Sequence, residues 1–199
     1  VTGVDLVQSQ IRLAQGATIA ELGLDAPDIA RPRGFAIQAR VCLETIAADG
    51  SIRPGGGTLT AYEPPSGPGI RTDGFGYTGY RTSGSYDSLL AKVIAHTPTP
   101  RFADAVARAT RALGEFRLDG VGTNIPFLRA ILGHADFQAG TVHTRWLDER
   151  MTDLAAAAEQ QKPRHMEAAA PARSDGGFAG ARVANARDPL ALFAHDAQV

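Results

Sequence analysis

The fold is decided most clearly by one stretch of the sequence, Phe35-Ala36-Ile37-Gln38-Ala39-Arg40-Val41-Cys42-Leu43-Glu44. Apolar side chains alternate here with small or polar ones, and a period of two is typical of a β-strand with one buried face. The opposite face carries Gln38, Arg40 and Glu44. Because residues two apart on a strand share a face and lie about 6 to 7 Å apart, we expect a polar strip opposite the core.

Short strands, turns and then helices are predicted on the C-terminal side of this stretch. Two further strands, from Thr58 to Tyr62 and from Leu89 to His96, are separated by glycine- and proline-rich turns instead of helices. The period then changes to that of helices, which we expect from Pro100 to Phe116, after the N-cap candidate Asn124, and from Trp146 to Gln161. The sequence therefore predicts an α+β fold in which an antiparallel sheet is covered by helices.

The two ends of the chain differ in character from its middle. An amphipathic helix is predicted over residues 1–16, and its pattern is already under way at the first residue, which is not methionine. From Lys162 onward alanine, proline, glycine and arginine dominate, a composition that buries too little apolar area to offset the entropy of ordering. We interpret the chain as a segment of a longer protein that ends in a low-complexity linker, with one short docking segment from Asp188 to Asp196.

Composition argues against several classes of function. The formal net charge of -1 and the pI of about 6.6 argue against a protein that mainly binds nucleic acid. No run of 18 apolar residues is present, so no membrane span is predicted. Cys42 is the single cysteine, which excludes an intramolecular disulfide and a thiolate metal cluster. We expect a cytoplasmic location, no nucleic-acid or membrane partner, and no metal site in this sequence.

Arg40 on the polar face of the first strand is the best candidate for chemistry. A guanidinium held beside a carboxylate is pre-oriented and permanently charged, so it could stabilise an oxyanion that develops on a substrate. The alternative is a solvent-facing salt bridge on an edge strand. Asp87, just before the strand that starts at Leu89, is interpreted either as the buried partner of an arginine across the sheet or as a residue that ends a turn.

Several motifs, taken in order, resemble those of biotin carboxylases. They are Val1-Thr2-Gly3-Val4-Asp5-Leu6-Val7-Gln8-Ser9-Gln10-Ile11-Arg12, Phe35-Ala36-Ile37-Gln38-Ala39-Arg40-Val41, Gly67-Pro68-Gly69-Ile70-Arg71, Tyr86-Asp87-Ser88-Leu89-Leu90-Ala91-Lys92 and Thr123-Asn124-Ile125-Pro126-Phe127-Leu128. The resemblance extends over about residues 1 to 155 and is greatest to multidomain biotin-dependent acyl-CoA carboxylases. It implies that residues 1–30 end an ATP-grasp lobe, that residues 31–155 form a biotin carboxylase C-terminal domain, and that residues 156–199 are a linker toward a following domain.

The resemblance also implies an activity, the ATP-dependent carboxylation of biotin with bicarbonate inside an acyl-CoA or pyruvate carboxylase. In that family bicarbonate attacks ATP to give carboxyphosphate, and a biotin enolate captures the CO2 that is released. Arg40 matches the family arginine that holds the ureido oxygen of this enolate, and Asp87 matches the acidic residue that supports that arginine. The implied cofactors are biotin on a carrier domain, ATP and Mg2+. The ligands of ATP and Mg2+ are expected before residue 1, so this segment alone is expected to be inactive.

Partners are implied by the same resemblance. Arg71 and Pro68 match a region near the dimer interface of related enzymes, although a bulkier residue is common where Pro68 stands. A biotin carrier domain, a carboxyltransferase domain or subunit and a second copy of the enzyme are the expected partners. The alternative function is that of a non-catalytic scaffold or dimerisation lobe in such an assembly.

Overall fold

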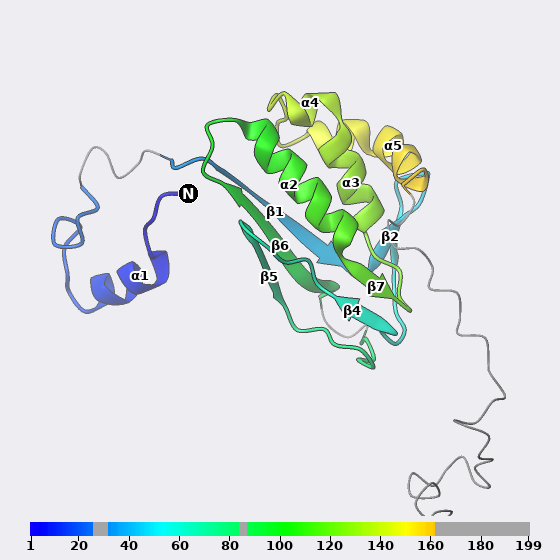
Figure 1. Ribbon diagram of the computed structural model, residues 1–199, viewed down its shortest axis with the longest axis horizontal. Coiled ribbons are helices and arrows are strands. Elements are labelled where there is room, and N and C mark those ends of the chain that lie inside the picture. Colours follow the sequence, from blue (N-terminus) through cyan, green and yellow to red (C-terminus); the bar gives the residue numbers. More distant parts are fainter. Residues whose placement is uncertain (26–31, 84–86, 162–199) are drawn as a thin grey trace, which may run out of the picture. The chain divides into compact units, whose positions relative to one another are not determined.

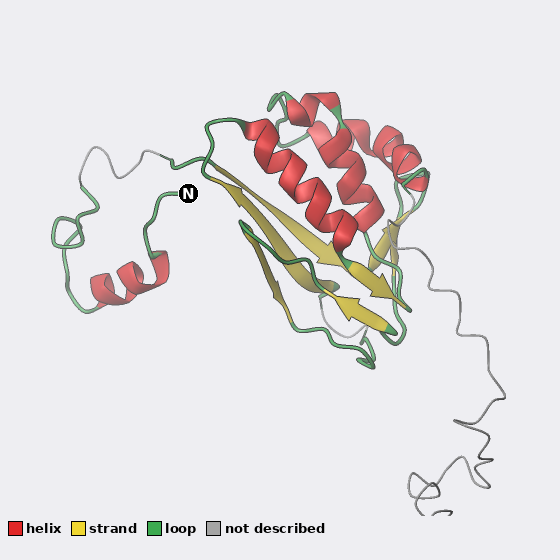
Figure 2. Cartoon of the chain, in the orientation of Figure 1, coloured by secondary structure: helices red, strands yellow, loops and turns green. Residues whose placement is uncertain are grey.

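The computed structural model describes residues 1–25, 32–83 and 87–161 (Figure 1). Helices and strands follow one another in the order α1 (Leu6–Ala14), β1 (Phe35–Cys42), β2 (Glu44–Ile46), β3 (Ile52–Pro54), β4 (Ala61–Glu63), β5 (Ile70–Gly74), β6 (Leu89–Thr97), α2 (Phe102–Glu115), β7 (Arg117–Asp119), α3 (Ile125–Gly133), α4 (Ala135–Gln138) and α5 (Trp146–Glu159). Figure 2 shows the strands in one layer, with helices α2 and α3 covering one side of it. The prediction of an α+β fold is confirmed.

The central sheet contains three antiparallel strands in the order β1-β6-β5. Its register places Arg40 opposite Lys92, and Lys92 opposite Asp73 on the far strand. Two smaller antiparallel pairs, β2 with β3 and β4 with β7, complete the strand pairing of the described residues. Strand β6 is therefore hydrogen-bonded on both sides, whereas β1 and β5 are edge strands.

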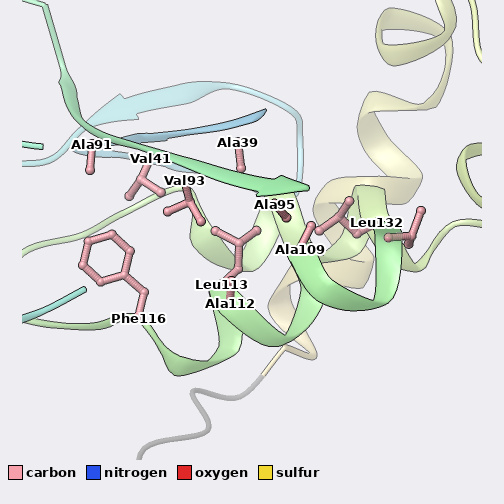
Figure 3. Packing of buried hydrophobic residues seen from close by; sticks show 11 residues of the cluster. Ala39, Val41, Ala91, Val93, Ala95, Ala109, Ala112, Leu113, Phe116 and Leu132 are labelled. Carbon is pink, nitrogen blue, oxygen red and sulfur yellow. The ribbon is translucent and has the colours of Figure 1, made fainter. Parts of the chain in front are cut away.

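Helix α2 packs on one face of this sheet and makes the main core (Figure 3). The sheet contributes small side chains, so the helix approaches it closely, while Leu113 and Phe116 of the helix side fill the remaining space. Phe116 is 1% exposed and meets Tyr62 of β4 edge-to-face, with the ring centroids 5.5 Å apart. The buried members of this cluster are Ala39, Val41, Ala91, Val93, Ala95, Val106, Ala109, Ala112, Leu113, Phe116 and Leu132.

A second cluster joins α3 to α5. Trp146 is buried there, and its indole N–H donates to Asp136 Oδ2 at 3.0 Å. This hydrogen bond is the largest cause that lowers the pKa of Asp136, followed by the nearby charges of His134 and Arg150. Helix α5 runs to Glu159 and buries Ala158, so its packing extends beyond residue 155, where we predicted the domain to end.

The first long strand is shorter than its pattern predicts. It ends at Cys42 because the pairing register shifts between Val41 and Cys42, and Leu43 N then donates to Ser88 O at 2.7 Å. The strand predicted at Thr58 to Tyr62 is also displaced, because β4 covers Ala61–Glu63 and Thr58 makes only an isolated bridge.

The start of β1 depends on one glycine. Gly34 has a φ of 78°, and a Cβ at this position would collide with the backbone oxygen of Thr97. Only glycine fits a left-handed turn packed this closely against the end of β6.

The ends of the chain are described only in part. Residues 1–25 contain α1, which is shorter than the helix predicted over residues 1–16: it begins after the N-cap Asp5, whose Oδ1 accepts from Gln8 N at 2.9 Å, and ends at Ala14. Nearly all of the predicted linker, including the docking segment from Asp188 to Asp196, lies outside the described residues. In the parts of the chain that the structure describes, every helix is too short or too polar to cross a membrane.

Candidate active site on the open face of the sheet

The face of the sheet opposite α2 carries most of the candidate residues. The register places Arg40, Lys92 and Asp73 in one row across the three strands, and alternation along β5 puts Arg71 on the same face. Lys92 was not among the residues that the sequence singled out. Its place beside Arg40 depends on the strand register, which a pattern within each strand does not determine.

Arg40 is paired with Asp87 on this face. The Nη2 atom of Arg40 lies 3.3 Å from Asp87 Oδ2, and the other carboxylate oxygen accepts from Leu89 N at 3.2 Å. The carboxylate is therefore anchored to the first residue of β6 while it contacts the guanidinium. The structure thus brings together the two residues that the resemblance linked.

The pair is exposed to solvent. The side chains of Arg40 and Asp87 are 52% and 68% exposed, so the interpretation of Asp87 as a buried partner is wrong. An exposed arginine on an edge strand agrees with both interpretations of Arg40, the solvated salt bridge and the oxyanion-binding group. An accessible guanidinium is also what a group delivered from outside the domain requires.

Glu44 is not part of the polar strip that the alternation predicted. The register shift after Val41 moves it into β2, where its carboxylate accepts from the Ser88 hydroxyl at 3.0 Å. Arg40 and Glu44 are therefore separated by the irregular residue Leu43, and the acidic partner of Arg40 on the described residues is Asp87.

Asn124 is a site residue whose contacts the sequence did not indicate. It stands at the N-cap position of α3, as predicted, but its side chain makes no capping hydrogen bond. Instead the side-chain amide contacts β1: Oδ1 accepts from Cys42 N at 2.9 Å, and Nδ2 donates to Arg40 O at 3.1 Å. An asparagine just before a helix is so commonly a cap that nothing in the local sequence distinguishes this use.

Cys42 lies next to these contacts and is buried at 8% exposure. Burial raises the pKa of its thiol, an effect only partly opposed by a hydrogen bond with Ser88. A buried thiol with a raised pKa is poorly reactive. Cys42 is therefore a packing residue of the strand and not a nucleophile.

Arg71 and Pro68, the two residues expected near a dimer interface, lie on or beside β5. Arg71 is 72% exposed on its side chain and pairs with Asp73 at 3.0 Å. Pro68 is exposed, and its backbone oxygen accepts from Arg108 Nη1 at 2.8 Å, which ties the turn before β5 to α2. Both residues are accessible from solvent at the edge of the sheet that faces away from β6.

Metal-binding residues do not cluster in the described part of the chain. Over residues 1–25, 32–83 and 87–161, His, Cys, Asp and Glu form no group of three or more that could hold a metal ion. His134 instead caps α4, because its Nδ1 accepts from Asp136 N at 3.1 Å.

Comparison with known proteins relates this geometry to one family. A mitochondrial pyruvate carboxylase from Mus musculus is 44% identical over 153 residues, which are 75% of this chain and 12% of that enzyme. A single-chain, multi-domain long-chain acyl-CoA carboxylase has a similar structure, with a TM-score of 0.70 and 45% identity over 78% of this chain and 17% of that one. The biotin carboxylase domain dimer of 2-oxoglutarate carboxylase from Hydrogenobacter thermophilus, solved with MgADP and bicarbonate, gives a TM-score of 0.65 and 34% identity over 77% of this chain and 32% of that one.

The chain thus spans only a small part of the proteins it resembles. The family model described as the biotin carboxylase C-terminal domain matches residues 38–149, which include Arg40, Asp87, Lys92 and Asn124. This match extends over more than half of the sequence and over all three strands of the central sheet. The chain belongs to the family of biotin carboxylase C-terminal domains.

Proposed function

We propose that this chain supplies the C-terminal wall of a biotin carboxylase, the enzyme unit that carboxylates biotin with ATP and bicarbonate. The unit would belong to a biotin-dependent acyl-CoA or pyruvate carboxylase, since relatives of both kinds share the domain. The observation that carries the proposal is the Arg40 guanidinium, which is accessible on the open face of the sheet and paired with Asp87 at 3.3 Å.

Arg40 would act as a fixed donor of positive charge. A guanidinium is positively charged and offers several N–H groups, so it can donate to an oxygen that gains negative charge during the reaction. Such charge-assisted hydrogen bonds are short and strong. Asp87 would keep the guanidinium oriented, because its second oxygen is held by the backbone of Leu89.

Biotin fits this site in its chemistry. The ureido group of biotin has a carbonyl oxygen that accepts hydrogen bonds, and the guanidinium of Arg40 offers several N–H donors to such an oxygen. When bound, biotin supplies the nitrogen that accepts the carboxyl group. Arg40 is 52% exposed on its side chain, so a group attached to a separate carrier domain can reach it.

We assign ATP and Mg2+ to no described residue of this chain. The described residues have no cluster of acidic or histidine ligands, and the open face offers Arg40 and Lys92 beside Asp73 and Asp87 instead. As the resemblance implies, the ligands of ATP and Mg2+ would lie before residue 1, and this chain would supply the biotin-facing wall.

The proposed partners follow from the assignment of only the biotin-facing wall to this chain. A biotin carrier domain would approach the open face near Arg40, and a carboxyltransferase domain or subunit would take the carboxyl group onward. A second copy of the enzyme would contact the edge formed by β5, where Arg71 and Pro68 are exposed.

The test is the substitution Arg40→Ala in the complete carboxylase. Biotin carboxylation is measured as fixation of labelled bicarbonate on free biotin. By analogy with removal of one oxyanion donor, we expect kcat to fall about 100- to 1,000-fold. Arg111→Ala is the matched control, because Arg111 also pairs with an exposed carboxylate, Glu115, at 2.7 Å, but lies on α2. Normal carboxylation by an intact Arg40→Ala assembly would overturn the catalytic assignment and favour the scaffold function.

A further inference from the structure

Asn124 makes hydrogen bonds to the outer edge of β1 at its C-terminal end, beside Arg40. In the three-stranded sheet β1 has a neighbour, β6, on one side only. The carboxamide of Asn124 takes the place of a neighbour on the other side, with Nδ2 donating to Arg40 O at 3.1 Å and Oδ1 accepting from Cys42 N at 2.9 Å. A carboxamide has the same donor and acceptor as a peptide group, so it pairs with an edge strand as another strand would.

The backbone of Asn124 strengthens this contact. Asn124 N donates to Cys42 O at 3.2 Å, so main chain and side chain together make three hydrogen bonds to two residues of β1. Asn124 is 8% exposed, which keeps water away from these bonds. Backbone groups buried without a partner are costly, so loss of the carboxamide would release or shift this end of the strand.

Helix capping does not account for the asparagine. The side chain makes no hydrogen bond to the first turn of α3, even though it stands at the N-cap position. The strand is also irregular at this point, since the register with β6 shifts between Val41 and Cys42. The hydrogen bonds from Asn124 therefore hold β1 where its pairing with β6 is interrupted, and one of them is made to Arg40 itself.

We propose that Asn124 is a positioning residue for Arg40. Asp87 holds the guanidinium from the β6 side, and Asn124 holds the backbone from which the side chain extends. The two contacts come from opposite edges of β1, so the arginine is constrained at both ends. This inference rests on the proposed function of Arg40 as the group that binds the charged oxygen.

The test is a double-mutant cycle in the complete carboxylase, with Asn124→Ala and Arg40→Ala alone and together. Fixation of labelled bicarbonate on free biotin is measured together with the thermal midpoint of each variant. A misplacement of about 1 Å costs on the order of 100-fold in rate. We expect Asn124→Ala to lower kcat about 10- to 100-fold in the enzyme that retains Arg40, and less than about twofold in the Arg40→Ala background.

Two further variants keep the result interpretable. Asn124→Asp retains an acceptor for Cys42 N but loses the donor to Arg40 O, so we expect an intermediate kcat even if Asn124→Ala does not fold. Gln138→Ala is the matched control, because that carboxamide also donates to a backbone oxygen, Leu132 O at 3.2 Å, on another side of the domain. It is expected to leave kcat unchanged.

The outcomes separate the positioning role from a structural one and from failure of the proposed function. Equal losses in both backgrounds, or a kcat for Asn124→Ala and Asn124→Asp like that of the unmodified enzyme, would overturn the positioning role. Normal activity of Arg40→Ala alone would instead show that the proposed function of Arg40 is wrong. Loss confined to the enzyme with Arg40 supports the inference.

Discussion

The two faces of the β1-β6-β5 sheet are built for different tasks although the same three strands form both. The covered face presents alanine and valine to α2, and its members in the core are at most 7% exposed. The open face presents Arg40 and Arg71, each paired with a solvent-exposed carboxylate, and the half-buried Lys92. Because alternate residues of one strand point to the two faces, the residues of the core and those of the proposed site are separated by a single position along the chain.

We therefore expect substitutions on the covered face to lower the free energy of unfolding, and substitutions on the open face to lower the rate of biotin carboxylation. Removing apolar volume from the covered face costs transfer free energy and leaves a cavity. Exposed ion pairs contribute little to stability because water and salt screen them. Unfolding and catalysis should therefore respond to different residues of the same strands.

The largest effect on stability is expected from Phe116→Ala on the covered side. Phe116 is 1% exposed and fills the space between the sheet, α2 and Tyr62. We expect the free energy of unfolding to fall by about 3 to 5 kcal/mol, measured by urea denaturation of this chain. Biotin carboxylation per folded molecule of the complete enzyme should stay within about twofold, since the open face is unchanged. A loss below about 1 kcal/mol would contradict the description of this core.

Asp87→Asn on the open face should lower kcat while leaving the stability of the fold almost unchanged. The change keeps the size of the side chain but removes the charge that pairs with Arg40, at 68% exposure. We expect the free energy of unfolding to change by less than about 1 kcal/mol, because the pair is solvated. The kcat for biotin carboxylation should fall about 10- to 100-fold as the guanidinium loses its orientation.

The control for this prediction is Glu115→Gln, which neutralises the similarly exposed pair with Arg111 on α2. Glu115→Gln should change the free energy of unfolding by no more than an ion pair on a helix contributes, about 0.3 to 0.5 kcal/mol. It should leave kcat unchanged. Equal kcat values for Asp87→Asn and Glu115→Gln would remove the distinction between the two ion pairs.

The smallest effect on stability is expected from Arg71→Ala at the β5 edge. Arg71 is 72% exposed and pairs only with its neighbour on the strand, Asp73, among the contacts of the described residues. The free energy of unfolding should change by no more than about 0.5 kcal/mol. If the proposed dimer uses this edge, sedimentation of the complete carboxylase should shift toward the monomer, whereas Arg53→Ala on β3 should leave it unchanged. An unchanged sedimentation profile for Arg71→Ala would argue against a role for this edge in the dimer.

Local patterns in the sequence predicted the elements that carry the covered face. The period-two stretch that contains Arg40 forms β1, and the helical period after Pro100 forms α2. Each of these elements buries one face in the core, so its apolar residues recur with the period of a strand or a helix. Short elements were missed: β5, the third strand of the central sheet, contains five residues, and β7 and the β2–β3 pair contain three in each strand. Such strands are stabilised by partners that are distant in sequence, for example Ala61 with Asp119, and a local pattern does not contain that information.

In the candidate site, Arg40 and Asp87 were predicted from the sequence, whereas Lys92 and Asn124 were not. The resemblance linked Arg40 to Asp87, and the structure places them in contact. Lys92 needed the strand register, and Asn124 needed the approach of α3 to the outer edge of β1, two facts that arise only when the elements assemble. A local pattern reveals only features within one strand or helix, and the pairing of Arg40 with Asp87, which lie on different elements, was expected from the resemblance alone.

Because Cys42 is buried, the rate at which it is alkylated can report on local opening at the C-terminal end of β1. While the strand is closed, the thiol is largely shielded from an alkylating reagent, and its raised pKa keeps it in the less reactive protonated form. The rate of labelling therefore counts opening events two residues from Arg40, on the single cysteine of the sequence. A mass-spectrometric time course of that one adduct would record how often the backbone next to Arg40 opens, without any cysteine having to be introduced.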